Sequence, residues 1–198
     1  MAFIAALVLG CTAASAQNSA VTFYGGARSG GTFYDEHNGS ASVKFANGAA
    51  FAMSYDWLMT DGRQGQVFYS FQHTSLPGSV LDRPEKLVVD VHYLHVGGRV
   101  FFDGGATTHG GYVVGGLGLT LFSPKGAGLT SELRPSANLG IGYQWMLSKE
   151  LALRTELRGY LTLVNSSGDF FCSGGCVVAI RGDGVSQGEG LLGLSFNF

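Results

Sequence analysis

The sequence has few of the features that mark several other classes of protein. Beyond its first residues, no stretch reaches the roughly 18 consecutive apolar residues from which a membrane-spanning helix is built. Charged residues make up 13% of the chain and the net charge is −2, so no basic surface is available for nucleic acid. The three cysteines have no adjacent histidine that would complete a zinc site. No nucleic-acid partner, metal or cofactor is therefore expected.

The first residues have the pattern of an export signal. Residues 2–9 (AFIAALVL) form a short apolar run, and A-S-A at 14–16 matches a small-residue cleavage site. Residues 1–16 are therefore interpreted as a signal peptide, with 17–198 as the mature domain. A second interpretation is open: VLGC at 8–11 loosely resembles a lipobox, which would make Cys11 a lipidated first residue.

Glycine is abundant, and the strand signal is strong. The chain has 32 glycines, roughly twice the average share, without a collagen-like period. Apolar residues alternate with small or polar ones in eight segments of about ten residues, the pattern of transmembrane β-strands. The segments are 21–28, 49–57, 66–74, 87–102, 111–122, 133–146, 151–163 and 186–198.

The same alternation would suit a periplasmic β-sandwich, so other features must separate the two folds. Aromatic residues such as Trp57, Trp145 and Phe196 lie near segment ends, as girdle residues do at membrane interfaces. The connections also alternate in length, as outer-membrane barrels require. Residues 58–65, 103–110 and 147–150 are the short set, and 29–48, 75–86, 123–132 and 164–185 are the long set. The expected fold is all-β, a single eight-stranded antiparallel up-and-down transmembrane β-barrel in the bacterial outer membrane.

Several stretches resemble a known family. The opening VTFYGGARSGG, the segment GGYVVGGLGLTL and the terminal GLSFNF are similar to small bacterial outer-membrane β-barrel proteins of the OmpA/OmpX type. The resemblance covers the mature chain, although no further domain follows the barrel. In that family a terminal Phe on an alternating strand is read by the barrel-assembly machinery. The resemblance implies this role for Leu192, Leu194, Phe196 and Phe198.

An eight-stranded barrel has an interior that side chains can fill, so charges inside it need partners. The charged positions expected in the lumen are Arg28, Asp56, Asp90, Arg154, Glu156 and Arg158. A lumen filled in this way argues against a general porin, and a narrow low-conductance path stays open as an alternative. A bulge near Gly97 and Gly98 would leave the orientation of His92 and His95 open.

The longest connection contains FFCSGGC. In an oxidising compartment, Cys172 and Cys176 are expected to form a disulfide that shapes the loop tip. The ring is small, so its stabilisation is only about 2 kcal/mol. Free thiols are the alternative.

One group of residues could support catalysis. His73 and Ser75 lie two apart on one strand face, and Glu85 follows, which supplies the parts of an activated nucleophile. Some outer-membrane lipid A deacylases are eight-stranded barrels with an H-x-S pair and a later Glu. This sequence resembles them only in that tripeptide, so an enzyme is not the favoured interpretation.

The expected role is therefore structural or surface-interacting, with any ligand bound by the outer loops. The expected partners are outer-membrane lipid and lipopolysaccharide, and the barrel-assembly machinery during biogenesis. A monomer is expected.

Overall fold

The structure is a computed structural model. It describes residues 19–34, 42–76, 86–103, 109–126, 129–164, 169–170, 178–179 and 184–198. The predicted signal peptide, the two loop cysteines and Glu85 lie outside these residues. No helix in the described part of the chain is long and apolar enough to cross a membrane.

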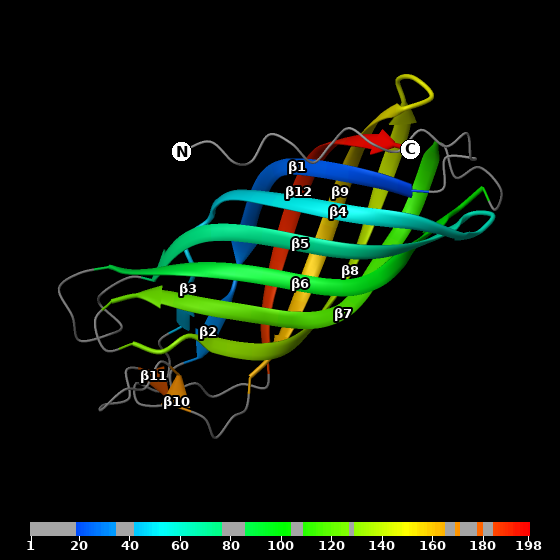
Figure 1. The fold of residues 1–198 in the computed structure, drawn as a ribbon. Helices are drawn as coiled ribbons and strands as arrows, with labels where there is room; N and C mark the ends of the chain where they lie inside the picture. The colour runs from blue at the N-terminus through cyan, green and yellow to red at the C-terminus, as the bar shows by residue number, and fades with distance from the viewer. Residues whose placement is uncertain are drawn as a thin grey trace, which may run out of the picture.

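Eight long strands form one closed antiparallel barrel (Figure 1). Around the barrel the order is β1-β12-β9-β8-β7-β6-β5-β4, so each long strand pairs with its neighbours in sequence and the last closes on the first. The all-β up-and-down fold predicted from the alternation is confirmed. The strands are β1 (Ser19–Gly30), β4 (Gly48–Thr60), β5 (Arg63–Leu76), β6 (Leu87–Phe101), β7 (Gly110–Lys125), β8 (Glu132–Met146), β9 (Leu151–Leu163) and β12 (Gly184–Asn197).

The connections alternate between short and long as predicted, with one exception. One end of the barrel has the connections 61–62, 102–109 and 147–150, and the opposite end, called here the outer end, has 31–47, 77–86, 126–131 and 164–183. The exception is 126–131, which is shorter than 102–109 because β7 extends to Lys125, beyond its predicted end at residue 122. The first turn is shorter than predicted because Asp61-Gly62 forms a tight hairpin, with Gly62 at φ 73°. The sequence analysis did not predict two small hairpins within the outer connections. These are β2 (Thr32–Tyr34) with β3 (Ser42–Lys44), and β10 (Asp169–Phe170) with β11 (Val178–Ala179).

The polarity of the barrel is the reverse of that of a soluble protein. Side chains at alternate positions of every long strand are buried inside, and many of these are polar or charged. The intervening positions point outward and carry exposed large apolar side chains. Among them are Phe23, Phe51, Leu94, Leu117, Leu139, Ile141, Leu157, Leu161, Leu192 and Phe196. Such an outer wall is stable against lipid, which excludes the sandwich alternative.

The barrel closes between β1 and β12. The register runs from Ala20 opposite Asn197 to Gly30 opposite Gln187. Ser19 and Phe198 complete it, because each backbone N–H donates to the other residue's carbonyl, at 3.1 and 2.9 Å. Closure leaves no unpaired strand edge in the lipid, where an unsatisfied backbone group is costly.

Phe198 points outward and is 62% exposed, so its side chain is accessible from outside the barrel. We expect Phe198→Lys to lower the assembled fraction several-fold while export continues, because the backbone pair with Ser19 is kept and only the outward aromatic is lost. Heat-modifiable gel migration of outer-membrane fractions measures the assembled fraction.

Phe102→Lys is the matched control, since Phe102 is an equally exposed aromatic that does not lie on the closing strand. Equal losses in the two variants would mean that β12 carries no special signal.

Candidate functional site: the barrel interior

The interior has two zones that differ in chemistry. The polar zone comprises Arg28, Arg99, Arg154, Arg158, Asp56, Glu156 and Glu189, together with the side chains that bond to them. The apolar zone, nearer the outer end, comprises Phe45, Leu76, Leu87, Val89, Val91, Phe122, Val164 and Val185. All fifteen side chains are buried.

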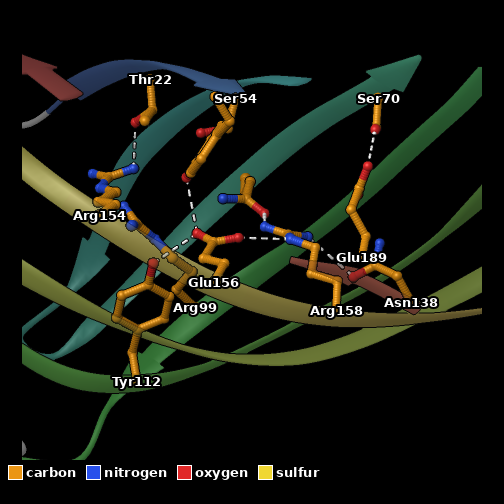
Figure 2. A network of polar contacts seen from close by, with 12 residues as sticks. Thr22, Ser54, Ser70, Arg99, Tyr112, Asn138, Arg154, Glu156, Arg158 and Glu189 are labelled. Atoms are coloured by element: carbon orange, nitrogen blue, oxygen red, sulfur yellow. Dashed lines mark hydrogen bonds and ion pairs between the residues drawn. The ribbon is translucent and has the colours of Figure 1, made fainter. Parts of the chain in front are cut away.

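Glu156 lies at the centre of the polar zone. Its carboxylate accepts hydrogen bonds from the Tyr24 and Tyr112 hydroxyls at 2.8 and 2.7 Å, and Arg158 Nε lies 2.7 Å from its other oxygen (Figure 2). Arg158 also donates to Gln66 and Asn138, and its guanidinium lies 3.7 Å from the centre of the Phe68 ring. The ion pair is therefore held on all sides.

Two inward glycines make this arrangement possible. A Cβ at Gly193 would lie 2.4 Å from the Tyr24 ring, and one at Gly142 would lie 2.5 Å from the Tyr112 ring. A larger residue at either position would displace a tyrosine from Glu156. The glycine content of the chain is thus linked to the packing of its buried charges.

Asp56 binds two arginines nearer the short-turn end. Arg154 Nη1 lies 2.7 Å from its Oδ2 and Arg99 Nη2 lies 3.3 Å from the same atom. Gln66 donates to the other oxygen at 2.7 Å. Arg154 also donates to Thr22 (Figure 2). A further hydrogen bond runs from Arg154 to Gln144.

Glu189 forms the third layer, nearer the outer end. Arg28 Nη2 lies 2.9 Å from its Oε1, and both side chains are fully buried. The Ser70 hydroxyl donates to Oε1 at 2.8 Å and the Tyr160 hydroxyl donates to Oε2. Arg28 also lies against the faces of Tyr93 and Tyr160, at 4.7 and 5.3 Å, which adds cation–π attraction.

The apolar zone closes the lumen above these layers. Phe45, which follows the small hairpin β2–β3, stacks on Phe122 of β7 with ring centres 6.0 Å apart. Valines and leucines from β5, β6 and β12, together with Val164 directly after β9, complete the cluster. The sequence analysis did not predict this zone, since it treated the whole lumen as polar.

Asp90 was predicted as a lumen charge, and this prediction is wrong. Its side chain points outward from β6, where Nδ1 of His73 lies 2.6 Å from one carboxylate oxygen and Nζ of Lys125 lies 2.8 Å from the other. The error has a physical cause. The apolar zone places Leu87, Val89 and Val91 inside, so hydrophobicity no longer indicates which face of this strand points to lipid.

The possible catalytic residues His73 and Ser75 also point outward. His73 bonds to Asp90, whereas the predicted partner Glu85 lies outside the described residues. In the described part of the chain no hydrogen bond joins Ser75 to His73. No three His, Cys, Asp or Glu residues within the described ranges are placed to hold a metal ion.

Sequence reasoning missed Arg99 and Glu189. Glu189 could have been found, because it has the same parity as the inward residues Gly193 and Ser195 on the last strand. Arg99 follows Gly97 and Gly98, where a bulge was predicted. The pairing of β6 runs without a register shift through both glycines, so Arg99 points inward. His95 also points inward and bonds to Ser136, whereas His92 points outward and bonds to Tyr69.

Comparison with known proteins supports the fold. A scan against protein-family models and a search of curated proteins return no match. Among solved structures, neisserial surface protein A matches with a TM-score of 0.59 and 14% identity, over 92% of this chain and 98% of that chain. OprG of Pseudomonas aeruginosa matches with 0.55 and 11%, over 91% and 96%, and the outer membrane protein AlkL with 0.53 and 15%, over 98% and 97%. At these identities the likeness shows the fold.

Fold and polarity together define the class of protein. A closed barrel with an apolar outer wall and a polar, ion-paired interior is a transmembrane β-barrel. More particularly, the chain has the fold of the small eight-stranded barrels of the bacterial outer membrane, and this membrane is where it is located.

The polar zone predicts a large stability effect at Glu156. Glu156→Gln should lower the free energy of unfolding by about 3 kcal/mol, because it leaves Arg158 buried without a carboxylate. Urea titration of the refolded protein in detergent, followed by gel migration, measures the change.

Glu150→Gln is the control, since Glu150 is exposed in the turn 147–150 and should change the stability by less than about 0.5 kcal/mol. Adding Arg158→Gln to Glu156→Gln should recover part of the loss, because the unpaired charge is removed. If the double variant is no more stable than Glu156→Gln, the ion pair with Arg158 is not the source of the stability that Glu156 contributes.

Proposed function

We propose that this protein is a sealed outer-membrane barrel whose role is structural or is exerted through its outer connections. The observation that carries the proposal is the filled lumen. Three layers of ion pairs and an apolar zone lie in series along the interior, and each is made of buried side chains. A solute would have to break both kinds of packing to pass.

The chemistry of the two zones supports separate barriers. The arginines of the polar zone are bonded to carboxylates, hydroxyls and amides, so moving one aside would leave a buried charge without its partner. The apolar zone offers no polar group to replace the hydration of an ion. A continuous water-filled path is therefore not expected.

The outer end is the place for interaction with partners. The hairpins β2–β3 and β10–β11 both arise from long outer connections and lie at one end of the barrel (Figure 1). Loops held on a rigid barrel are a common way of presenting a binding surface. Lipopolysaccharide is the partner that we propose for this end, because it is the lipid that surrounds the outer end of such a barrel.

Planar-bilayer recordings test the sealed lumen. We expect no stable conductance steps from the wild-type protein. The variant Phe45→Ala with Phe122→Ala should also stay silent, because the ion-pair layers remain intact below the opened apolar zone. Large, stable steps from the wild type would contradict the proposal. Steps from the double variant alone would assign the seal to the apolar zone.

A second test separates surface binding from catalysis. Refolded protein incubated with lipopolysaccharide vesicles should bind them and release no acyl chain by mass spectrometry, because Ser75 is not bonded to His73. Replacing residues 165–183 by a short turn should weaken binding several-fold. The ends to be joined are close, since Gly184 pairs with Leu163.

Replacement of residues 103–109 at the opposite end is the control and should leave binding unchanged. Acyl release that disappears in Ser75→Ala would instead establish a hydrolase. If the two replacement variants bind lipopolysaccharide equally well, the outer connection 165–183 is not the binding surface.

A further inference from the structure

The outer wall of the barrel contains an apolar hollow of about 760 Å³. It crosses β1, β12, β9 and β8, and reaches the start of β7. Its size lies within the roughly 300–1,000 Å³ range of pockets that hold small molecules. Most of the side chains that line the hollow point outward, unlike those of the lumen sites described above. Four inward residues, Gly26, Gly142, Glu156 and Leu191, also border it.

The strand register explains why the wall is hollow here. In one row across the strands, Tyr143, Thr155, Leu192 and Gly25 lie side by side. In the next row toward the outer end, Ile141 and Leu157 are followed by Gly190. Small residues at Gly25, Thr155 and Gly190 therefore form the floor, and the large apolar side chains around them form the walls.

The glycines of the floor are not required by crowding. A Cβ at Gly25 would have no atom within 4 Å, and one at Gly190 would meet only Leu157 Cδ2 at 3.6 Å. The inward Gly26 is different, since its Cβ would lie 2.0 Å from the Gly190 carbonyl oxygen. Glycine within a strand weakens it, and it often marks a place where a ligand approaches the backbone closely.

The occupant follows from where the hollow lies. Leu157, Leu192 and Ile141 are exposed side chains of the lipid-facing wall and also line the hollow, so the two surfaces are continuous. Water is disfavoured there, because the walls are apolar and offer few hydrogen-bond partners. A second barrel would meet this wall with its own convex surface and could not fill a concavity. A flexible hydrocarbon chain could.

We propose that this hollow is a binding site for one acyl chain of a membrane phospholipid. Tyr143 lies three residues before β8 ends at Met146, so the hollow belongs to the half of the membrane near the short turns. The chain would lie over the backbone at Gly25 and Gly190 between Leu157 and Leu192. This site goes beyond the proposed function and does not depend on any role of the outer connections.

The two tryptophans of the chain provide a built-in probe and control. Trp145 packs against Tyr143 of the hollow with ring centres 4.5 Å apart. Trp57 is on β4, where it packs against Tyr55. The variant Trp57→Phe keeps only Trp145, whose fluorescence reports on the hollow. The variant Trp145→Phe keeps only Trp57, whose fluorescence reports on ordinary lipid contact.

Each single-tryptophan protein is titrated in detergent micelles with a phosphatidylcholine that carries a dibrominated acyl chain, which quenches tryptophan fluorescence. Quenching of Trp145 should saturate near one lipid per barrel, whereas quenching of Trp57 should rise steadily with the lipid fraction. Gly25→Leu with Gly190→Leu should abolish the saturating phase. Ala49→Leu, which places a leucine at an outward position outside the hollow, should preserve it.

Gly25→Ala with Gly190→Ala is a milder filling variant if the leucine pair does not fold, and heat-modifiable migration checks folding in every case. A brominated fatty acid should reproduce the saturating phase, and glycerophosphocholine should not compete with it, because the chain and not the headgroup is bound. Identical quenching curves for the two tryptophans would overturn the proposal. So would a dimer in sedimentation that is lost in Gly25→Leu, since a second copy would then occupy the wall.

Discussion

The closure of β12 onto β1 is the constraint on which the rest of the structure depends. Inside a bilayer no water is available to satisfy a strand edge, so a sheet of eight strands is stable only when its first and last strands pair along their whole length. The paired backbone groups of Ser19 and Phe198 show how far that pairing extends. Once the sheet is closed, every side chain must point either to lipid or into a confined interior.

That confinement determines the chemistry of the lumen. Four arginines and three carboxylates share the polar zone, so Asp56 serves both Arg99 and Arg154, and hydroxyls and amides such as Thr22 and Gln144 accept further hydrogen bonds. The tyrosines around Glu156 and Glu189 donate hydrogen bonds and also fill volume. Inward glycines such as Gly142 and Gly193 provide the space that these large side chains need.

The same residue type has an opposite consequence on the outer wall. Where Gly25 and Gly190 point outward, no side chain of the protein fills the space and a hollow remains between larger neighbours. The outer wall also carries a charged group, in which His73, Asp90 and Lys125 join three adjacent strands near their outer ends. The chemical character of the lumen and that of the outer wall therefore both change along the length of the barrel.

The sequence by itself determined the number of long strands, their approximate limits, all but one of the differences in length between the connections at the two ends, and the reversed polarity of the barrel. These follow from a two-residue period and from glycine-containing turns, which are local properties of the chain. The seventh predicted strand was correct at both ends, Leu151 and Leu163, because its leucines and charges alternate without interruption.

Only the tertiary structure decided which side chains meet across the lumen. A period of two gives each strand two faces, but it does not say which residues of distant strands lie at the same height once the barrel is closed. Arg28 meets Glu189, 161 positions away, and Arg154 meets Asp56, 98 positions away. The orientation of Asp90 and the apolar zone around Phe45 and Phe122 were likewise decided by packing, since at that end of β6 the apolar face points inward and the face with Asp90 and His92 points outward.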